Sequence, residues 1–168
     1  MIHNILSNMG LKMIKIFVRL FCLAFVFNIL FFPMIALAHQ TLPYVSLLKE
    51  MFTKVTLEKN NKAIPLYYDK DFKLYTNGKT MDYEEFLKQH EAIYKTPIQY
   101  KIRYEDETLI EQGNKVAGRL FITTQRPNES AHEIEVILIA KYKNNKLYRV
   151  WELTYPDWSQ LKAFKNLS

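Results

Sequence analysis

The chain has 168 residues, which by length is a single domain, and its formal net charge is +6. It holds one cysteine, Cys22, and only four glycines. The sequence therefore excludes an internal disulfide and a glycine-rich phosphate-binding loop.

Residues 1–38 have the pattern of a signal peptide. They carry three basic residues and no acidic one, and residues 20–38 are almost wholly apolar. The apolar stretch closes with Ala-Leu-Ala, whose small residues stand at the two positions that a signal peptidase requires. We therefore expect residues 1–38 to be removed and residues 39–168 to form an exported domain, either periplasmic or secreted.

The alternative is an uncleaved membrane anchor over residues 14–38. An apolar stretch over residues 20–38 approaches the ~20 residues that span a bilayer and exceeds the ~7–15 of a usual signal core. The Ala-Leu-Ala end and the nearby Pro33 favour cleavage. We expect contact with a membrane only if this segment is retained.

Beyond residue 38 the chain has no cysteine, and the loss of Lys12, Lys15 and Arg19 lowers the net charge from +6 to +3. This part can form no disulfide, no thiolate metal site and no cysteine nucleophile. A charge of +3 is too small to indicate a nucleic-acid partner. A chain of this size can bury enough surface to be stable through its core alone.

The first predicted element is an amphipathic helix of about four turns. Tyr44, Leu48, Met51 and Val55 recur at helical spacing, and Asn60-Asn61 ends the pattern.

A helical turn, a strand and a second helix are predicted next. The helical turn covers Ile64–Tyr68, the strand covers Asp71–Thr76, and Asn77-Gly78 is a turn signal. Asp82 and Glu85 have the spacing of a capping box, which predicts a helix that begins there.

The rest of the chain predicts strands, over residues 98–111, 115–125, 134–142 and 147–155. Short turns between them indicate antiparallel pairing. Helices followed by a run of strands indicate an α+β fold with the helices on one face of the sheet. The strands are apolar on both faces, which favours a homodimer formed through the sheet.

Two segments resemble the nuclear transport factor 2-like superfamily, also called SnoaL-like or cystatin-like α+β. They are Asn114–Arg119, similar to that family's "D-K-V-A-x-R", and Asn144–Thr154, similar to its last hairpin with "K-I-x-R-V-W-E". The resemblance covers residues 41–158. It implies a cone in which N-terminal helices pack in the concave face of a curved antiparallel sheet, around an apolar pocket that is empty, ligand-binding or catalytic in different members.

His90 is the sharpest candidate for chemistry. It lies on the helix face that carries Tyr83, Phe86 and Tyr94, so we expect it to point inward. It is either a pocket acid, base or hydrogen-bonding group, or a core histidine whose nitrogens bond a backbone carbonyl or a tyrosine.

Glu152 and Trp151 occupy opposite faces of the last strand, so only one of them can line the pocket. A glutamate that faces the pocket would have a raised pKa and would be a second catalytic candidate. We expect instead a solvent-facing or ion-paired Glu152, because glutamate is seldom buried. Trp151 would then be a pocket wall or a core residue.

Aromatic residues are the candidate ligand contacts. The resemblance places tyrosines at the pocket mouth, where an apolar ring with a polar tip suits an amphipathic ligand. The predicted ligand-binding residues are Tyr67, Tyr68, Tyr75, Phe86, His90, Tyr94, Tyr100 and Trp151.

The resemblance also tests for isomerase activity. Ketosteroid isomerases of the superfamily carry a general-base aspartate at the end of the first strand, and the corresponding position here is about Thr76, flanked by Tyr75 and Asn77. None is a carboxylate, which argues against that reaction. His39 and His132 have no metal-ligand spacing, so neither a metal site nor a cofactor is predicted.

Three functions remain open at this point. The first is an exported domain that binds a small apolar or amphipathic ligand. The second is an enzyme of the isomerase or cyclase kind that uses His90 with Glu152 or a tyrosine. The third is a structural subunit of a periplasmic or secretion assembly.

Overall fold

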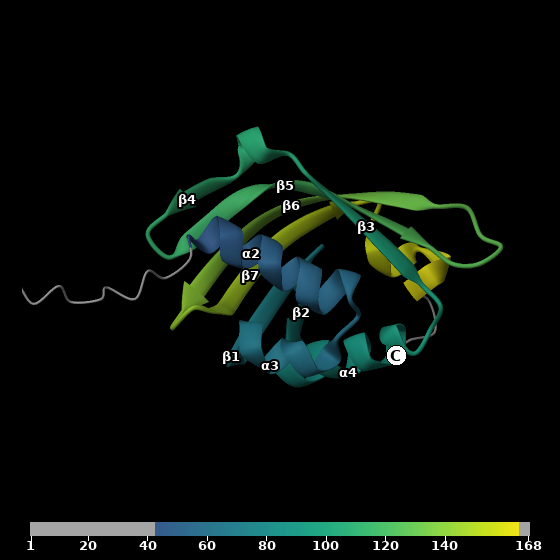
Figure 1. Ribbon diagram of the computed structural model, residues 1–168, viewed down its shortest axis with the longest axis horizontal. Coiled ribbons are helices and arrows are strands. Elements are labelled where there is room, and N and C mark those ends of the chain that lie inside the picture. Colours follow the sequence, from purple (N-terminus) through teal and green to yellow (C-terminus); the bar gives the residue numbers. More distant parts are fainter. Residues whose placement is uncertain (1–42, 165–168) are drawn as a thin grey trace, which may run out of the picture. The chain divides into compact units, whose positions relative to one another are not determined.

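The computed structural model describes residues 43–164, so the predicted N-terminal signal or anchor lies outside the described residues. A curved sheet wraps around helices that lie against its concave face (Figure 1). The helices are α2 (Tyr44–Met51), α3 (Ile64–Tyr67) and α4 (Tyr83–Tyr94). The π-helix η1 (Phe52–Leu57) continues α2 directly, and a single 3-10 turn, η2 (Asn61–Ala63), precedes α3. The predicted α+β architecture is confirmed.

The sheet has seven strands. They are β1 (Tyr68–Thr76), β2 (Lys79–Asp82), β3 (Gln99–Tyr104), β4 (Ile110–Gln112), β5 (Lys115–Gln125), β6 (His132–Lys143) and β7 (Lys146–Tyr155). Their order is β2-β1-β7-β6-β5-β3, and β4 pairs with β5 beyond the end of β3. Short turns after β3, β7 and residue 161 are η3 (Asp106–Thr108), η4 (Trp158–Gln160) and η5 (Lys162–Phe164).

Three details of the sheet differ from the expectation. The short strand β2, which pairs antiparallel with β1, was not among the predicted strands. The sheet is mixed, because β1 pairs in parallel with β7 while the other pairs are antiparallel. Asn77 stabilises this junction through its side chain. Its Nδ2 donates to the Thr154 hydroxyl at 2.7 Å, and the Thr154 backbone amide donates to its Oδ1 at 3.0 Å. The single strand predicted over residues 98–111 is instead β3 and β4, separated by η3.

The break between β3 and β4 has a local cause. The Thr108 hydroxyl donates to the Glu105 carbonyl at 2.8 Å and accepts from the Arg119 amide at 2.9 Å. This hydroxyl therefore satisfies backbone groups that a continuous strand would have paired, and the chain makes one turn before it rejoins β5.

The local turn and cap signals are confirmed. Asp82 accepts from the Glu85 amide and Glu85 reaches back to the Asp82 amide, which is a complete capping box at the start of α4. Gly78 and the Asn144-Asn145 pair of the β6–β7 hairpin have positive φ, which glycine and asparagine tolerate best.

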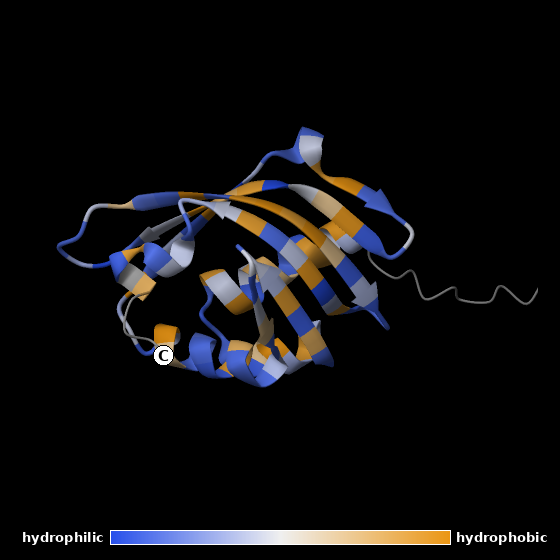
Figure 2. Ribbon diagram, turned by 180° about the vertical axis from the view of Figure 1, so that it is seen from behind, coloured by the Kyte–Doolittle hydropathy of each residue, from blue (hydrophilic) through white to orange (hydrophobic). Residues whose placement is uncertain are grey.

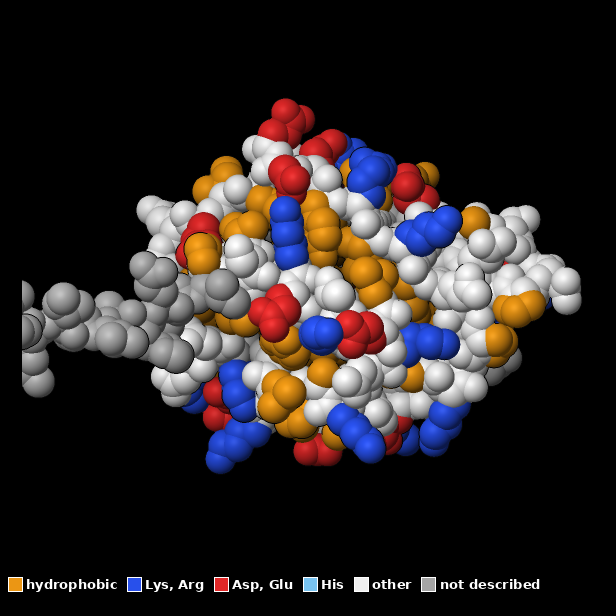
Figure 3. Space-filling model, viewed as in Figure 1, with side chains coloured by type: hydrophobic (Ala, Val, Ile, Leu, Met, Phe, Trp, Pro, Cys, Tyr) orange, Lys and Arg blue, Asp and Glu red, His pale blue; other side chains and the backbone are white. Residues whose placement is uncertain are grey.

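The strands alternate between an inner and an outer face. Hydrophobic and hydrophilic residues follow one another along them (Figure 2). Buried residues such as Val116, Leu120, Val136 and Leu138 point to the concave side, where they pack with the helices. On the face seen in Figure 3, acidic and basic side chains are intermixed without a broad area of one charge.

Candidate functional site

A cavity of about 160 Å³ lies in the core, between the concave face of the sheet and the helices α2, η1 and α4. Most of its wall is apolar, with side chains such as Met51, Phe72, Leu138 and Val150. The few polar side chains in the wall are therefore the groups that can give a bound molecule its orientation.

His90 lies on α4 and lines the cavity. Its Nδ1 lies 2.8 Å from the Phe86 carbonyl oxygen, one turn earlier in the helix. A carbonyl only accepts, so Nδ1 carries the proton and the neutral ring keeps a lone pair on Nε2. One nitrogen is therefore satisfied by the backbone, as expected of a core histidine, and the residue also faces the cavity.

Burial lowers the pKa of His90 to about 4, although the bond to the Phe86 carbonyl acts in the opposite direction. The imidazole is therefore neutral at pH 7. Phe86 and Tyr94 flank the ring, with centroids 3.9 Å and 5.4 Å away. A neutral, aromatic-lined imidazole is a hydrogen-bond acceptor for a ligand rather than a strong base.

Glu152 also lines the cavity, which corrects the expectation that it faces solvent. It lies on β7 directly opposite Thr76 of β1, and both point to the concave side. Burial raises its pKa, while hydrogen bonds from Thr76 and Trp158 act against that rise. The indole nitrogen of Trp158 is also 3.3 Å from the Thr76 hydroxyl.

Trp151 lies on the other face of β7, outside the cavity. Its ring stacks on Tyr75 of β1, with centroids 5.7 Å apart and planes 7° from parallel. Tyr67 is outside as well, since its hydroxyl donates to the Glu50 carboxylate at 2.7 Å. These three predicted ligand contacts are placed elsewhere because strand alternation turns Tyr75 and Trp151 outward and Tyr67 ends a surface helix.

The other predicted aromatic residues do line the cavity: Tyr68, Phe86, Tyr94 and Tyr100. Burial raises the pKa of Tyr68, Tyr94 and Tyr100 above its ordinary value, so these phenols stay protonated. The Tyr68 hydroxyl donates to the Met51 sulfur at 3.1 Å.

Thr124 is a cavity residue that the sequence did not reveal. It is 1% exposed, and its hydroxyl has no hydrogen-bond partner within the described part of the chain. A buried hydroxyl without a partner costs free energy, so it is available to a ligand. The sequence does not indicate this role, because threonine is common in β-strands and Thr124 stands in a predicted strand.

Trp158 and Phe164 complete the wall from the segment after the last strand. Their rings meet edge to face, with centroids 5.6 Å apart. The Asp157 carboxylate accepts from the amide and hydroxyl of Ser159, which fixes the turn that carries Trp158. In the sequence, only this capped turn could have been recognised, and a turn does not indicate that Trp158 and Phe164 line a cavity.

The described residues hold neither a metal-ligand cluster nor a membrane-spanning helix. In residues 43–164, no three histidine, cysteine or acidic side chains are grouped as metal ligands. In the same part of the chain, no helix is long and apolar enough to cross a bilayer.

The fold is shared with solved structures of low sequence identity. PrhC from Penicillium brasilianum is 13% identical, with a TM-score of 0.56 over 66% of this chain and 79% of its own. A candidate polyketide cyclase from Acidithiobacillus ferrooxidans is 14% identical, with a TM-score of 0.53 over 72% of this chain and 95% of its own. A candidate SnoaL-like polyketide cyclase from Jannaschia sp. is 7% identical, with a TM-score of 0.52 over 66% and 84%.

No protein-family model matches the sequence, and neither does any curated protein. The structural neighbours, the curved mixed sheet and the helices on its concave face agree with one another. The described domain therefore has the nuclear transport factor 2-like, SnoaL-like fold.

Proposed function

We propose that this is an exported domain that binds a small, mainly apolar molecule carrying at least one hydrogen-bonding group. The apolar cavity with His90, Thr124 and Glu152 in its wall is the observation that carries this proposal. The signal-peptide pattern of residues 1–38 supports export.

The size of the cavity limits the ligand. An apolar cavity of about 150 Å³ accommodates benzene, whereas sites for drug-sized molecules occupy about 300–1,000 Å³. With about 160 Å³, the cavity fits one ring with small substituents.

The polar groups limit the ligand further. Neutral His90 offers a lone pair that accepts a hydrogen bond, so it favours a ligand hydroxyl or amide donor over a pure hydrocarbon. The free Thr124 hydroxyl can donate or accept. A small phenol satisfies these requirements, and toluene has the same size without the polar group.

Titration with p-cresol and toluene tests the proposal. We expect calorimetry to show that p-cresol binds about fivefold more tightly than toluene, because one hydrogen bond between neutral groups contributes about 1 kcal/mol. Val136→Phe fills the cavity and is expected to abolish binding, since Val136 is 3% exposed and lines the wall.

Ile137→Phe is the matched control for this experiment. Ile137 is the next residue on the same strand, is 53% exposed and points to the outer face. The proposal fails if neither compound binds, or if Val136→Phe binds p-cresol as well as Ile137→Phe does.

Acid–base catalysis is a second candidate, and the position of Glu152 favours it. The place of the isomerase general base is held by Thr76, and the carboxylate of Glu152 lies beside it on the neighbouring strand. A buried carboxyl with a raised pKa can exchange a proton with a bound ketone. Deuterium uptake next to the carbonyl of a small aromatic ketone, lost in Glu152→Gln, would support this candidate.

We also propose a homodimer through the outer face of the sheet. Ile137 lies opposite Leu153 and Ile139 opposite Trp151, and these four residues are between 41% and 66% exposed. A contiguous apolar patch of this kind is typical of a subunit contact.

Light scattering of the Leu153→Glu variant tests the dimer. A charge in the centre of the patch is expected to convert dimers into monomers, because it would be buried without a partner. Leu66→Glu is the control, since Leu66 is 68% exposed on α3 and outside the patch. A wild-type chain that is monomeric at high concentration would contradict the proposal.

A further inference from the structure

Four basic residues form a row across the outer face of the sheet, one on each of four neighbouring strands. In the register of the sheet, Lys115 lies opposite Lys141, and Lys141 lies opposite Arg149. Arg149 in turn lies opposite Lys73 of β1. We call these four residues the basic row.

The side chains of the basic row all point away from the core. Each is flanked along its strand by a buried residue, which strand alternation turns to the inner face. Within residues 43–164, no carboxylate lies within ion-pair distance of any of the four. Arg149 donates instead to the backbone carbonyls of Asp71 and Tyr148, at 2.6 and 2.7 Å.

The acidic residues near the row are engaged elsewhere. Asp69 and Asp71 lie 3.8 and 3.6 Å from the ammonium of Lys143, in the β6–β7 hairpin. Asp82, opposite Lys73 on β2, caps α4. Glu111 accepts from the Val45 amide.

Like charges directly opposite each other on neighbouring strands are unfavourable. The four positive charges of the row repel one another and are not neutralised within the described domain. An anionic partner would neutralise them. Neighbouring strands lie about 4.8 Å apart, so four of them spread the charges over about 15 Å. One small anion cannot reach across that width, whereas an array of phosphate headgroups can.

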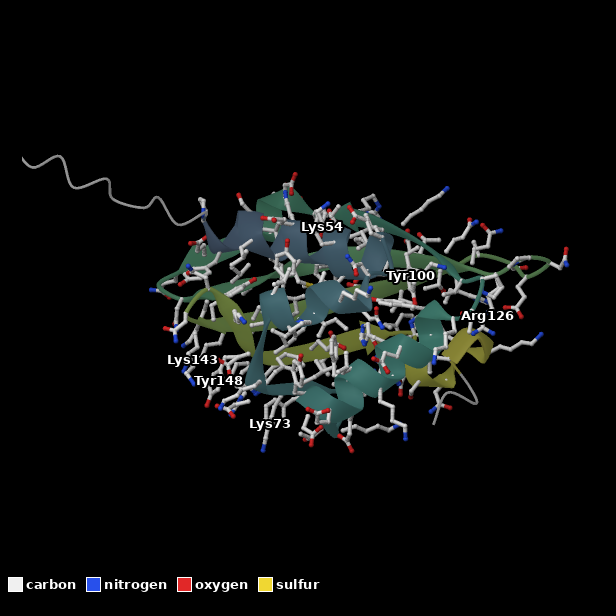
Figure 4. All side chains as sticks on the ribbon, turned by 60° about the horizontal axis from the view of Figure 1, so that its bottom comes forward. Lys54, Lys73, Tyr100, Arg126, Lys143 and Tyr148 are labelled. Atoms are coloured by element: carbon white, nitrogen blue, oxygen red, sulfur yellow. The ribbon has the colours of Figure 1, made fainter. Side chains whose placement is uncertain are left out.

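The place where the chain enters the domain favours a membrane as this array. Tyr44, the first residue of α2, shares a groove with Lys141, Lys143 and Tyr148. The apolar stretch of the sequence ends at residue 38, and the six residues from there to Tyr44 span at most about 20 Å. Lys73, Lys143 and Tyr148 gather at one end of the domain, away from Tyr100 and Arg126 (Figure 4).

A second copy of the chain is a poorer partner for the row. It would bring the same row of cations, and the acidic side chains at the other end of the outer face are already paired. Glu105 and Glu135 lie 2.9 and 2.7 Å from the Arg119 guanidinium.

We infer that, in the form of the chain that retains residues 20–38 as an anchor, the basic row docks the domain against a membrane surface that contains anionic phospholipid headgroups. The surface consists of Lys73, Lys115, Lys141 and Arg149, at the end of the domain where the N-terminal segment enters. Docking there fixes the orientation of the domain on the bilayer and leaves the cavity inside the sheet free. It competes with the proposed dimer for the outer face, because Lys141 and Arg149 are two residues from Ile139 and Trp151.

Lysine acetylation of the full chain in vesicles tests this inference. In the uncleaved chain, residues 20–38 are expected to insert equally into phosphatidylcholine vesicles and into vesicles with about one third phosphatidylglycerol. In the anionic vesicles, Lys73, Lys115 and Lys141 are expected to react about fivefold more slowly than in the neutral ones. Exposed Lys88 and Lys101, outside the row, are expected to react equally in both.

A charge-reversal pair provides the matched variants. Lys141→Glu is expected to remove the protection of Lys73 and Lys115, whereas Lys101→Glu leaves it unchanged, and high salt removes it in both. Equal rates in the two kinds of vesicle would overturn the inference, as would equal slowing at Lys101. Protection in neutral vesicles that grows with protein concentration would instead assign the row to a second copy. If added DNA protected the three lysines and anionic vesicles did not, the row would be assigned to nucleic acid.

Discussion

Acidification from pH 7 to pH 4 is expected to lower the free energy of unfolding by about 3 kcal/mol more in the wild-type chain than in a His90→Phe variant. Burial holds the pKa of folded His90 at about 4, below its ordinary value of 6.5. Between pH 6.5 and pH 4, His90 is protonated in the unfolded chain and stays neutral in the folded chain. The stabilising contribution of neutral His90 is thus complete above pH 6.5 and is lost as the pH falls toward 4.

Urea denaturation at a series of pH values measures this difference. Phenylalanine removes the titrating group and keeps an aromatic ring beside Phe86 and Tyr94, so the variant is expected to fold. The control is His132→Gln, because His132 is exposed on β6 and its replacement leaves the cavity intact. Parallel pH profiles for wild type and His90→Phe would show that His90 is not desolvated in the folded chain.

Phe72→Ala is expected to lower the free energy of unfolding by about 3–5 kcal/mol. Phe72 is 1% exposed, and its ring meets those of Tyr68 and Phe86 edge to face, with centroids 4.9 and 5.2 Å away. Truncation removes these contacts and enlarges a cavity that already exists, so the neighbouring side chains cannot close the gap. Chemical denaturation measures the change.

Lys70→Ala is the matched control for the truncation. Lys70 is exposed on the same strand, two residues earlier, and its replacement is expected to change stability by less than about 0.5 kcal/mol. A loss of under about 1 kcal/mol in Phe72→Ala would mean that the cavity collapses around the shorter side chain, and it would contradict a rigid cavity wall.

Local signals in the sequence predicted the elements well. The capping box at Asp82 and Glu85 and the asparagine pair of the last hairpin depend on contacts between near neighbours, which the sequence contains directly. The break at Thr108 was not predicted, because its hydroxyl acts on Arg119, which lies on another strand.

The candidate site was predicted only in part, for a physical reason. Alternation along β7 separates Glu152 from Trp151, but the pairing with β1 decides which of them faces the cavity. That pairing joins segments that are far apart in the chain, so it produces no periodic pattern in the sequence. The same holds for Thr124, Trp158 and Phe164, whose role depends on where the sheet bends and where the end of the chain returns.

The parallel pairing of β1 with β7 has a consequence for how the protein is made. Asn77 and Thr154, which bond each other at this junction, are 77 residues apart in the sequence. Until β7 has been synthesised, β1 has only the short strand β2 as a partner, so its other edge stays open. A chain that stays open for this long is suited to the translocation that we propose, because a secretion channel admits an extended polypeptide and not a closed cone.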